Sequence, residues 1–358
     1  MKLNTLLERY KRDISANLVK LFDSDPINLK SVNRWGKDVL NRLKEFSTRG
    51  KLLRGSLILL SSEMYSGKEI PGSIETATAI ELIHTSLLIH DDIMDRDELR
   101  RGMPTLHYQY KTIYPENSVD NHSYEALHFG EAMAICTGDI GFFIAFSILS
   151  NVQIEPFKIN RILKLWSSEF SYVGAAQMDD MYFEVLKENI SDENILNMYR
   201  YKTSRYTFSL PLVTGAELAG ASDRDIEILE ELGEKIGIIF QIKDDELGLF
   251  GSKEKTGKPT GSDIQEGKNT LYISYLRRMV KGKDRRTIEG IISRKDGSKG
   301  SIEKIKEIMV DSGIKSKIDN MVNKLKIEAK KLIDRLNISS EYKQLLNSLT
   351  EYMYKRDK

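Results

Sequence analysis

Apolar residues recur every three or four positions along nearly the whole chain, and polar residues fill the positions between them. This spacing is typical of amphipathic helices, which turn by about 100° per residue, whereas the strict alternation of strands is scarce. Only 7 of the 358 residues are proline, so few helices are interrupted. The pattern therefore predicts an all-α protein, with helices near 2–22, 29–46, 53–65, 72–97, 129–150, 156–187, 192–219, 222–249 and 269–281.

Three further features of the pattern concern its organisation. Pro211 predicts a bend in the helix expected at 192–219. The C-terminal third alternates apolar and Lys-rich positions, as in SIEKIKEIMVDSG, and predicts helices on the outside of the fold. Neither a repeat of fixed period nor a long linker separates parts of the chain, so residues 1–358 are expected to form a single domain. The polar span 111–128 is long for a connection inside a bundle and predicts a loop insertion.

Charge and hydropathy limit the partners that the chain can have. Lys+Arg total 54 and Asp+Glu total 53, so no net field draws the protein to nucleic acid. The most apolar run, 132–149, is marginal in length for a membrane span and contains Asp139, whose carboxylate would be costly in lipid. We therefore expect a buried core helix there and no membrane span. Residues 1–22 carry several charges and predict an amphipathic helix, and the only cysteine, Cys136, fits a cytoplasmic protein.

Two carboxylates point to one place at the end of the helix expected at 72–97. In the stretch HTSLLIHDDIMDRDELRRGMPTLH, Asp91 and Asp95 lie one turn apart on one stripe, with Asp92 beside them. Like charges this close repel unless a cation lies between them, and oxygen ligands suit Mg²⁺. The same residues could instead be a solvated helix end, because a D-D-x-x-D match arises by chance about one time in ten in a chain of this length.

A second helix repeats this layout. Gln241, Asp244 and Asp245 lie at i, i+3 and i+4 on one face, near the end of a helix that Ser222 is expected to cap. Each acidic end is followed by a loop rich in Lys or Arg. Acidic and basic clusters fit one site if a polyanion joins them, because Mg²⁺ bridges carboxylate to phosphate while Arg and Lys bind the remaining oxygens. P-loop, G-x-G-x-x-G and zinc spacings are absent from the sequence, which favours a metal-bound diphosphate in a helical bundle.

Taken together, these motifs resemble those of the trans-isoprenyl diphosphate synthases, or polyprenyl synthetases, and among them the archaeal-type geranylgeranyl diphosphate synthases. The resemblance covers roughly residues 30–280 and rests on Gly50-Lys51-x-x-Arg54, the stretch 84–107, Gln177-x-x-Asp180, Lys202-Thr203, and FQIKDDELGLF followed by TGKPTGSDIQEGKNT. It implies an all-α bundle of the isoprenoid synthase type around a central apolar cavity. It also implies a homodimeric, Mg²⁺-dependent transferase that joins isopentenyl diphosphate to an allylic diphosphate and gives an all-trans product.

The resemblance further implies a role for each matching residue. Mg²⁺ would be bound by Asp91, Asp95 and Asp244, with Asp92, Asp245 and Lys202 completing the catalytic set. The allylic diphosphate (dimethylallyl, geranyl or farnesyl) would be bound by Arg100, Lys202, Thr203, Gln241, Lys258 and Lys268. Isopentenyl diphosphate would be bound by Lys51, Arg54, His84 and Arg101. Each of these residues could instead have a purely structural role. His84 could be a core histidine with its hydrogen bonds satisfied, and the lysines and arginines could be ordinary surface residues.

Product length is expected to depend on a pocket wall formed by Ile83, Ser86 and Leu87, in the turns before Asp91. In the family, a bulky residue five positions before the first aspartate stops chain growth, and here that residue is the small Ser86. The resemblance therefore implies geranylgeranyl diphosphate (C20), with a C25 or longer product or farnesyl diphosphate as the alternative. Gly248 replaces the final aspartate that many members have in the second motif, so how a third metal is held is open.

Other classes of function stay open at this point. A class I terpene cyclase also uses a D-D-x-x-D helix, but Lys51, Arg54 and Arg101 favour a synthase that binds isopentenyl diphosphate. A non-catalytic partner subunit is disfavoured because both acidic motifs are intact. A helical interaction protein would show no Mg²⁺-dependent response to a diphosphate.

Overall fold

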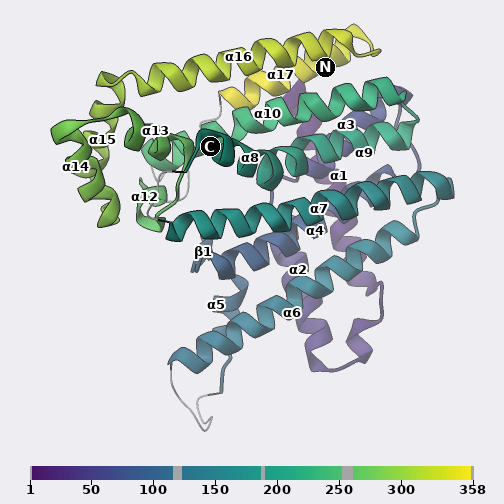
Figure 1. Cartoon of the computed structure of the whole chain (residues 1–358). Helices are drawn as coiled ribbons and strands as arrows, with labels where there is room; N and C mark the ends of the chain where they lie inside the picture. Colours follow the sequence, from purple (N-terminus) through teal and green to yellow (C-terminus); the bar gives the residue numbers. More distant parts are fainter. Residues whose placement is uncertain (1, 116–122, 187–189, 252–260, 356–358) are drawn as a thin grey trace. The chain divides into compact units, whose positions relative to one another are not determined.

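The computed structural model describes residues 2–115, 123–186, 190–251 and 261–355, and these are all-α apart from one two-stranded hairpin (Figure 1). Contacts divide the chain into two compact units. The first is Met1–Ile162 with Thr214–Gly220, and the second is Leu163–Val213 with Ala221–Lys358. The predicted all-α class is confirmed, while the single domain and the central apolar cavity stay predictions.

The first unit is organised around one apolar helix, α4 (Ser73–Met94). The other elements of this unit are α1 (Leu3–Ser24), η1 (Leu29–Ser31), α2 (Arg34–Thr48), α3 (Leu53–Ser66), β1 (Leu99–Arg100), β2 (Met103–Pro104), α5 (Leu106–Lys111), α6 (Ser123–Ser150), the start of α7 (Pro156–Val185) and most of α9 (Leu210–Ala219).

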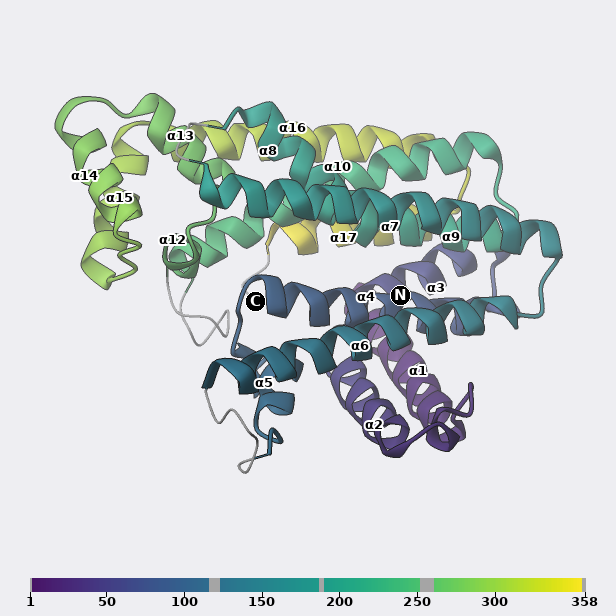
Figure 2. The ribbon, with the colours of Figure 1, turned by 60° about the horizontal axis from the view of Figure 1, so that its bottom comes forward.

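Close approach of helix backbones buries α4. Figure 2 shows α6 running beside α4, and α3 packs against another side of it. A Cβ on Gly55 of α3 would lie 2.7 Å from Ala77 O, and a Cβ on Gly141 of α6 would collide with Ser86 Oγ. Because only glycine has no Cβ, these two positions let the neighbouring helices reach the α4 surface directly. The part of α4 that precedes its acidic end is therefore tightly packed against α3 and α6.

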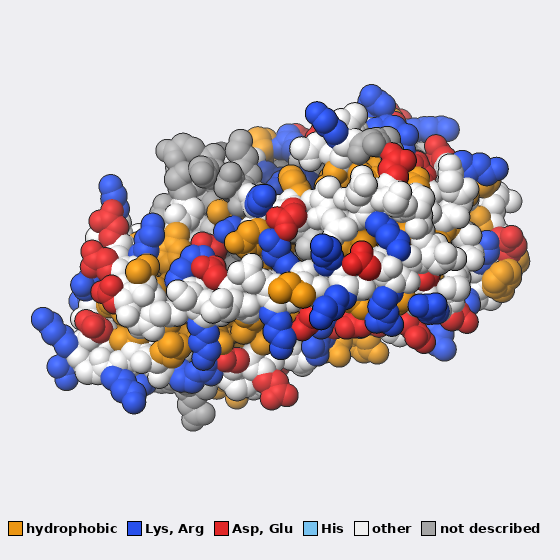
Figure 3. Space-filling view, turned by 90° about the horizontal axis from the view of Figure 1, so that it is seen from above, with side chains coloured by type: hydrophobic (Ala, Val, Ile, Leu, Met, Phe, Trp, Pro, Cys, Tyr) orange, Lys and Arg blue, Asp and Glu red, His pale blue; other side chains and the backbone are white. Residues whose placement is uncertain are grey.

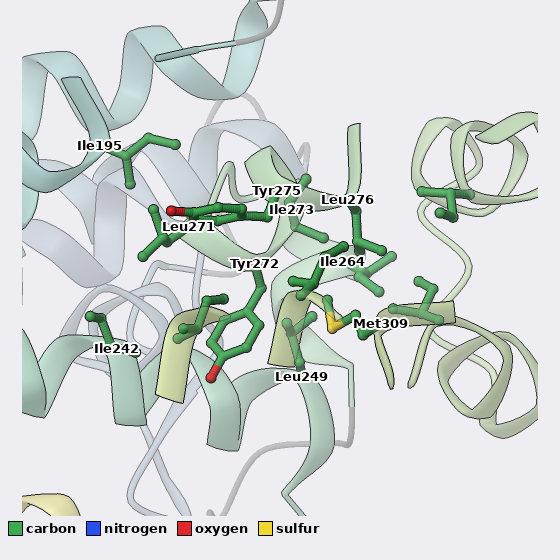
Figure 4. Packing of buried hydrophobic residues seen from close by; sticks show 14 of the residues in the cluster. Ile195, Ile242, Leu249, Ile264, Leu271, Tyr272, Ile273, Tyr275, Leu276 and Met309 are labelled. Atoms are coloured by element: carbon green, nitrogen blue, oxygen red, sulfur yellow. The ribbon is translucent and has the colours of Figure 1, made fainter. Parts of the chain in front are cut away.

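The second unit has its own apolar core. Its elements, besides the rest of α7, are α8 (Asp192–Tyr199), the π-helix η2 (Arg200–Ser209), α10 (Asp223–Phe250), α12 (Ser262–Glu266), α13 (Leu271–Met279), α14 (Gly282–Ser293), α15 (Lys299–Asp311), α16 (Ile314–Arg335) and α17 (Ser340–Tyr354). Figure 4 shows Ile242 and Leu249 of α10 in this core with Leu271 of α13 and Met309 of α15. Burying the two α10 side chains fixes the rotation of the helix segment that lies between them.

Most predicted helices are confirmed within a few residues, for example 53–65 as α3 and 222–249 as α10. Ser222 is the N-cap of α10, as predicted, and its side chain accepts a hydrogen bond from Asp225 N at 3.2 Å. The span 192–219 is divided into α8, η2 and α9. Residues 123–128 belong to α6 and not to a loop, so the polar span is shorter than predicted, and residues 116–122 lie outside the described part.

Two surface features bear on the expected partners. Figure 3 shows Lys and Arg side chains interspersed with Asp and Glu side chains on one face, which agrees with the balanced charge. Among the described residues, Tyr124–Ser150 in α6 is the one stretch long and apolar enough to cross a membrane. Ala134 and Ile144 are buried, but Phe143 is 70% exposed, so the predicted core helix is buried on one face. Length and composition alone are weak evidence for a span, because a core helix passes the same test.

Candidate active site

The first acidic motif, Asp91–Asp95, lies at the C-terminal end of α4. The helix ends at Met94, and the N–H of its C-cap Asp95 donates to Asp91 O at 2.8 Å. Asp91 and Asp95 are half-buried, whereas Asp92 is fully buried. Because residues four apart share a helix face, the motif presents two carboxylates on one side and packs the third inside.

The hairpin β1–β2 brings a cation to this motif. Arg100 of β1 donates from Nε to Asp92 Oδ1, and its Nη2 lies 3.4 Å from Asp91 Oδ2 and 3.5 Å from Asp97 Oδ2. Burial raises the pKa of Asp92 to about 7, although the charge of Arg100 opposes the shift. Arg100 was expected to bind the allylic diphosphate, and in this structure it also balances the buried aspartate.

A buried carboxylate, Glu81, holds the N-terminus of α3. Glu81 is 2% exposed, and its Oε1 accepts a hydrogen bond from Gly55 N at 2.7 Å. The N-cap residue Leu52 has a left-handed φ of 49° and gives no side-chain cap, so the cap comes from α4 instead. Burial raises the pKa of Glu81, and the charges of Arg54 and Arg101 oppose that shift. Glu81 therefore fixes the loop that precedes α3.

Three arginines act on the turn of α4 that carries Glu81 and His84. Loss of water around its guanidinium lowers the pKa of Arg101, and the positive charges of Arg100 and Arg54 lower it further, against the opposing charge of Glu81. Burial, followed by the charges of Arg54 and Arg101, lowers the pKa of His84 well below its usual value. His84 is therefore neutral at pH 7, and the arginines concentrate positive charge at this turn. Such a cluster suits an anion with several charges.

The residues expected to measure product length lie one to two turns before the first motif. Ile83 and Ser86 are buried, and Leu87 is half-buried. Ser86 Oγ faces the backbone of α6 at Gly141 and has no hydrogen-bond partner among the described residues. A larger side chain at position 86 therefore needs α6 to move away from α4.

The second acidic motif, Asp244–Gly248, lies near the C-terminal end of α10. Asp244 is exposed, and Asp245 is 5% exposed. The carboxylate of Asp245 accepts hydrogen bonds from Tyr199 OH and, at 2.8 Å, from Gln241 Nε2. The second motif therefore also presents its first aspartate and packs the next one inside.

Gly248, where the chain departs from the common family pattern, lies against another acidic residue. A Cβ on Gly248 would collide with the carboxylate of Asp263 in α12. Burial raises the pKa of Asp245 well above its usual value, and the charge of Asp263 raises it further. A third carboxylate thus stands beside the second motif, although it comes from a different element.

Of the lysines predicted for the allylic site in the second unit, the structure describes Lys202 and Lys268. Lys202 and Thr203 are half-buried in η2, and Lys202 Nζ forms an ion pair with Asp180 Oδ2 of α7. Lys268 follows α12, and its N–H donates to Asp263 O at 2.8 Å. Lys258 lies outside the described residues.

In the first unit, the structure brings together Arg54, His84, Arg100 and Arg101 at the α4 end, and Lys51 is exposed in the loop before α3. Sequence reasoning assigned no role to Glu81, although a lone glutamate inside the apolar stretch of α4 was a usable signal. It also missed Tyr199, because its partners lie tens of residues away in the chain.

Comparison with known proteins assigns the chain to a family. A model of the family described as Polyprenyl synthetase matches residues 37–309. The chain belongs to this family. This polyprenyl synthetase is 34% identical to the geranylgeranyl diphosphate synthase of Methanosarcina mazei over 313 residues, 86% of each chain. It is 33% identical to the geranylfarnesyl diphosphate synthase of Aeropyrum pernix over 314 residues, 86% of this chain and 91% of the other.

Solved structures agree with the assignment. The geranylgeranyl pyrophosphate synthase of Corynebacterium glutamicum, complexed with isoprenyl diphosphate and magnesium, matches with a TM-score of 0.88 at 26% identity, covering 99% of this chain and 100% of that one. The geranylgeranyl pyrophosphate synthetase of Pyrococcus horikoshii matches with a TM-score of 0.81 at 26% identity and the same coverage. The predicted family and fold class are confirmed, and the protein is a prenyltransferase.

Proposed function

We propose that this polyprenyl synthetase condenses isopentenyl diphosphate with an allylic diphosphate to give geranylgeranyl diphosphate. The observation that carries the proposal is the gathering of Arg54, Arg100 and Arg101 around Glu81 and His84, where burial and then the arginine charges lower the pKa of both Arg101 and His84. A diphosphate would relieve this repulsion, since arginine binds phosphate oxygens in a bidentate way. In the proposal, isopentenyl diphosphate binds here through Lys51, Arg54, His84 and Arg101.

The proposal assigns the allylic diphosphate to the two acidic motifs. Asp91, Asp95 and Asp244 would bind Mg²⁺, and the buried Asp92 and Asp245 would support them. The donors are all carboxylate oxygens, which suit Mg²⁺. No group of three or more potential ligands lies together among the described residues, so phosphate oxygens would complete the coordination, as is usual for Mg²⁺. The complex of the Corynebacterium glutamicum relative with isoprenyl diphosphate and magnesium supports this assignment.

In the proposed reaction, side chains bind and orient while the bond changes occur between the substrates. The remaining oxygens of the allylic diphosphate would be held by Arg100, Lys202, Thr203, Gln241, Lys258 and Lys268. Bound Mg²⁺ supplies positive charge to the leaving diphosphate. The allylic C–O bond breaks, the isopentenyl double bond attacks the resulting cation to form a C–C bond, and a proton is lost. The apolar surface of α4 would keep water from the cation.

The length of the product is the most specific part of the proposal. The relatives divide on it, because a geranylgeranyl and a geranylfarnesyl diphosphate synthase are almost equally similar to this chain. The small side chain of Ser86 favours a product of C20 or longer over farnesyl diphosphate. A C25 or longer product is the alternative, and it would require the pocket to extend past the contact of Ser86 with Gly141.

We also propose a homodimer in the cytoplasm. The side chains of Ile135, Phe143 and Phe146 in α6 are 44%, 70% and 37% exposed, and an apolar face of this kind is commonly buried in a subunit interface. Exposed Cys136 on the same helix fits a reducing compartment. Phe143→Glu should shift the protein from dimer to monomer in size-exclusion chromatography with light scattering.

An elongation assay tests the proposed function. The protein is incubated with Mg²⁺, labelled isopentenyl diphosphate and dimethylallyl, geranyl or farnesyl diphosphate, and the extracted product is sized by chromatography. The proposal predicts a C20 product from each primer and none when EDTA replaces Mg²⁺. Absence of elongation with every primer would overturn it, whereas a C25 product would overturn the length alone.

A further inference from the structure

The helix segment that carries Lys202 and Thr203 has an unusual form. Ten residues, Arg200–Ser209, make up the π-helix η2, and the N–H of Leu210 donates to Arg205 O, five residues back. π-turns are rare, are usually a single turn long, and are frequently found at functional sites. A wide turn of this length needs support from its surroundings.

Backbone packing supplies one support. Gly233 and Gly237 lie one turn apart in α10, and a Cβ on either would collide with η2 backbone atoms, at Ser209 and Ser204 respectively. Ser209 Oγ also donates to Glu230 O at 2.7 Å. Because the neighbouring atoms belong to the backbone and cannot turn away, alanine at either glycine would push η2 from α10.

Arg205 supplies a second support from inside η2. Its side chain is 14% exposed and lies among three carboxylates from two other helices. The guanidinium donates from Nε to Glu169 of α7 at 3.1 Å, from Nη1 to Glu234 at 2.6 Å, and from Nη2 to Glu230 at 2.5 Å. Burial alone would lower the pKa of Arg205, and the hydrogen bonds to these carboxylates raise it instead. Glu169 is itself 3% exposed, so this network is costly to break.

We infer that Arg205 is a positioning residue that holds η2 in its π form through its hydrogen bonds to Glu169, Glu230 and Glu234. The inference rests on the proposed function, because it assigns a purpose to the place of Lys202 and Thr203. An α-helix takes up about one residue fewer per turn than a π-helix. If η2 relaxed to an α-helix, the side chains of Lys202 and Thr203 would therefore point in other directions. The ion pair of Lys202 with Asp180 would then be broken.

This arrangement has a kinetic consequence. Misplacing Lys202 and Thr203 should weaken binding of the allylic diphosphate, whereas isopentenyl diphosphate is assigned to residues outside η2. Arg205→Met should therefore raise the KM for farnesyl diphosphate about tenfold or more, an effect of the size expected when a binding group is misplaced. The KM for isopentenyl diphosphate should stay within about twofold of wild type. Arg205→Lys, which keeps one charge but loses the planar fork, should recover part of the loss.

A double-mutant cycle tests the inference. Lys202→Ala, Arg205→Met and the double variant are compared by KM for farnesyl diphosphate. If Arg205 acts through η2, the double variant should be no worse than the poorer single one within about twofold, since the effects are coupled. Additive effects, or equal changes in both KM values, would overturn the inference. If Arg205→Met does not fold, Glu234→Gln replaces it in the cycle.

The glycine contacts give an independent check with a matched control. Gly237→Ala should raise the KM for farnesyl diphosphate and speed hydrogen exchange of the 200–209 amides. Gly300→Ala in α15, where a new Cβ would meet nothing within 4 Å, should change neither. Unchanged exchange and KM in Gly237→Ala would contradict the inference. Wild-type protein that elongates no primer would instead contradict the proposed function, so the two failures are distinguishable.

Discussion

The acidic ends of α4 and α10 bury an aspartate in different ways. Asp92 is balanced by the guanidinium of Arg100, whereas Asp245 is held by Tyr199 and Gln241, which carry no charge. In both motifs the preceding aspartate stays accessible. In each motif, the first aspartate of the Asp-Asp pair is therefore accessible as a proposed metal ligand, and the second is an anchor, meaning that it is buried and hydrogen-bonded inside the unit. The hydrogen-bond partner of the anchor depends on which element packs beside it.

The largest effects are expected at the accessible aspartates. Asp91→Asn and Asp244→Asn should each lower kcat/KM by about 10²- to 10³-fold, the usual cost of removing one group that stabilises developing charge. Their unfolding free energies should stay near wild type, because neither side chain is packed in the core. Asp334→Asn, an exposed aspartate of α16, is the control and should match wild type. An aspartate variant with full activity would remove that residue from the proposed metal site.

The two anchors should differ in stability. Arg100→Met leaves Asp92 without its countercharge and should lower the free energy of unfolding by about 3 kcal/mol. Tyr199→Phe removes the hydrogen bond to Asp245 and the one that Tyr199 OH accepts from Leu271 N, and should cost about 1–2 kcal/mol. Equilibrium urea unfolding measures both, with the exposed Arg286→Met as a control expected to change little. Equal losses at the two anchors would show that the charge of Arg100 does not set the difference.

The pocket side of α4 gives a prediction of product length. Ser86→Phe should shorten the product from C20 to C15, and because Ser86 faces the Gly141 backbone it should also destabilise the protein by about 1–3 kcal/mol. Ser86→Ala should leave length and stability near wild type. Chromatography of the products and thermal unfolding check both parts. A Ser86→Phe product of unchanged length would mean that the wall lies elsewhere.

A pH dependence of stability is also expected. The folded-state pKa of His84 lies well below its ordinary value of 6.5, so the unfolded chain binds the proton more readily. Stability should therefore be unaffected by His84 above about pH 6.5 and should fall as the pH drops below it, by at most about 1.4 kcal/mol per pH unit. His84→Gln should flatten this fall in Tm between pH 7 and pH 5. An identical slope in His84→Gln, or the same flattening in the exposed control His128→Gln, would contradict the assignment.

Sequence periodicity predicted much of this fold because it records which face of each helix is buried. It placed α3 and α10 within a residue or two, and it placed both acidic motifs at helix ends. It could not predict η2, because ten residues are too few for the period of a π-helix to show in the sequence. The π form also depends on Arg205 and on two glycines of another helix. The hairpin β1–β2 is too short to show alternation.

Some residues of the candidate site were predicted from the sequence, and others were found only in the structure. Outward residues such as Asp91 were predicted from spacing and resemblance, and their roles stay predictions. Internal partners such as Glu81 and Tyr199 were assigned no role, because a hydrogen bond between segments 26 or 46 residues apart leaves no local pattern. The resemblance raised the question of Gly248, and the position of Asp263 against it emerges only from the folded chain.

In the proposed function, both acidic motifs bind one diphosphate through Mg²⁺. Isothermal titration of inorganic pyrophosphate, with and without Mg²⁺, tests it in the wild type and in Asp91→Asn and Asp244→Asn. We expect binding that requires Mg²⁺, and we expect each substitution to weaken it at least about tenfold, a loss of about 1.4 kcal/mol. Binding that is equally tight without Mg²⁺ would contradict the proposed metal site. So would a result in which only one of the two substitutions weakens binding.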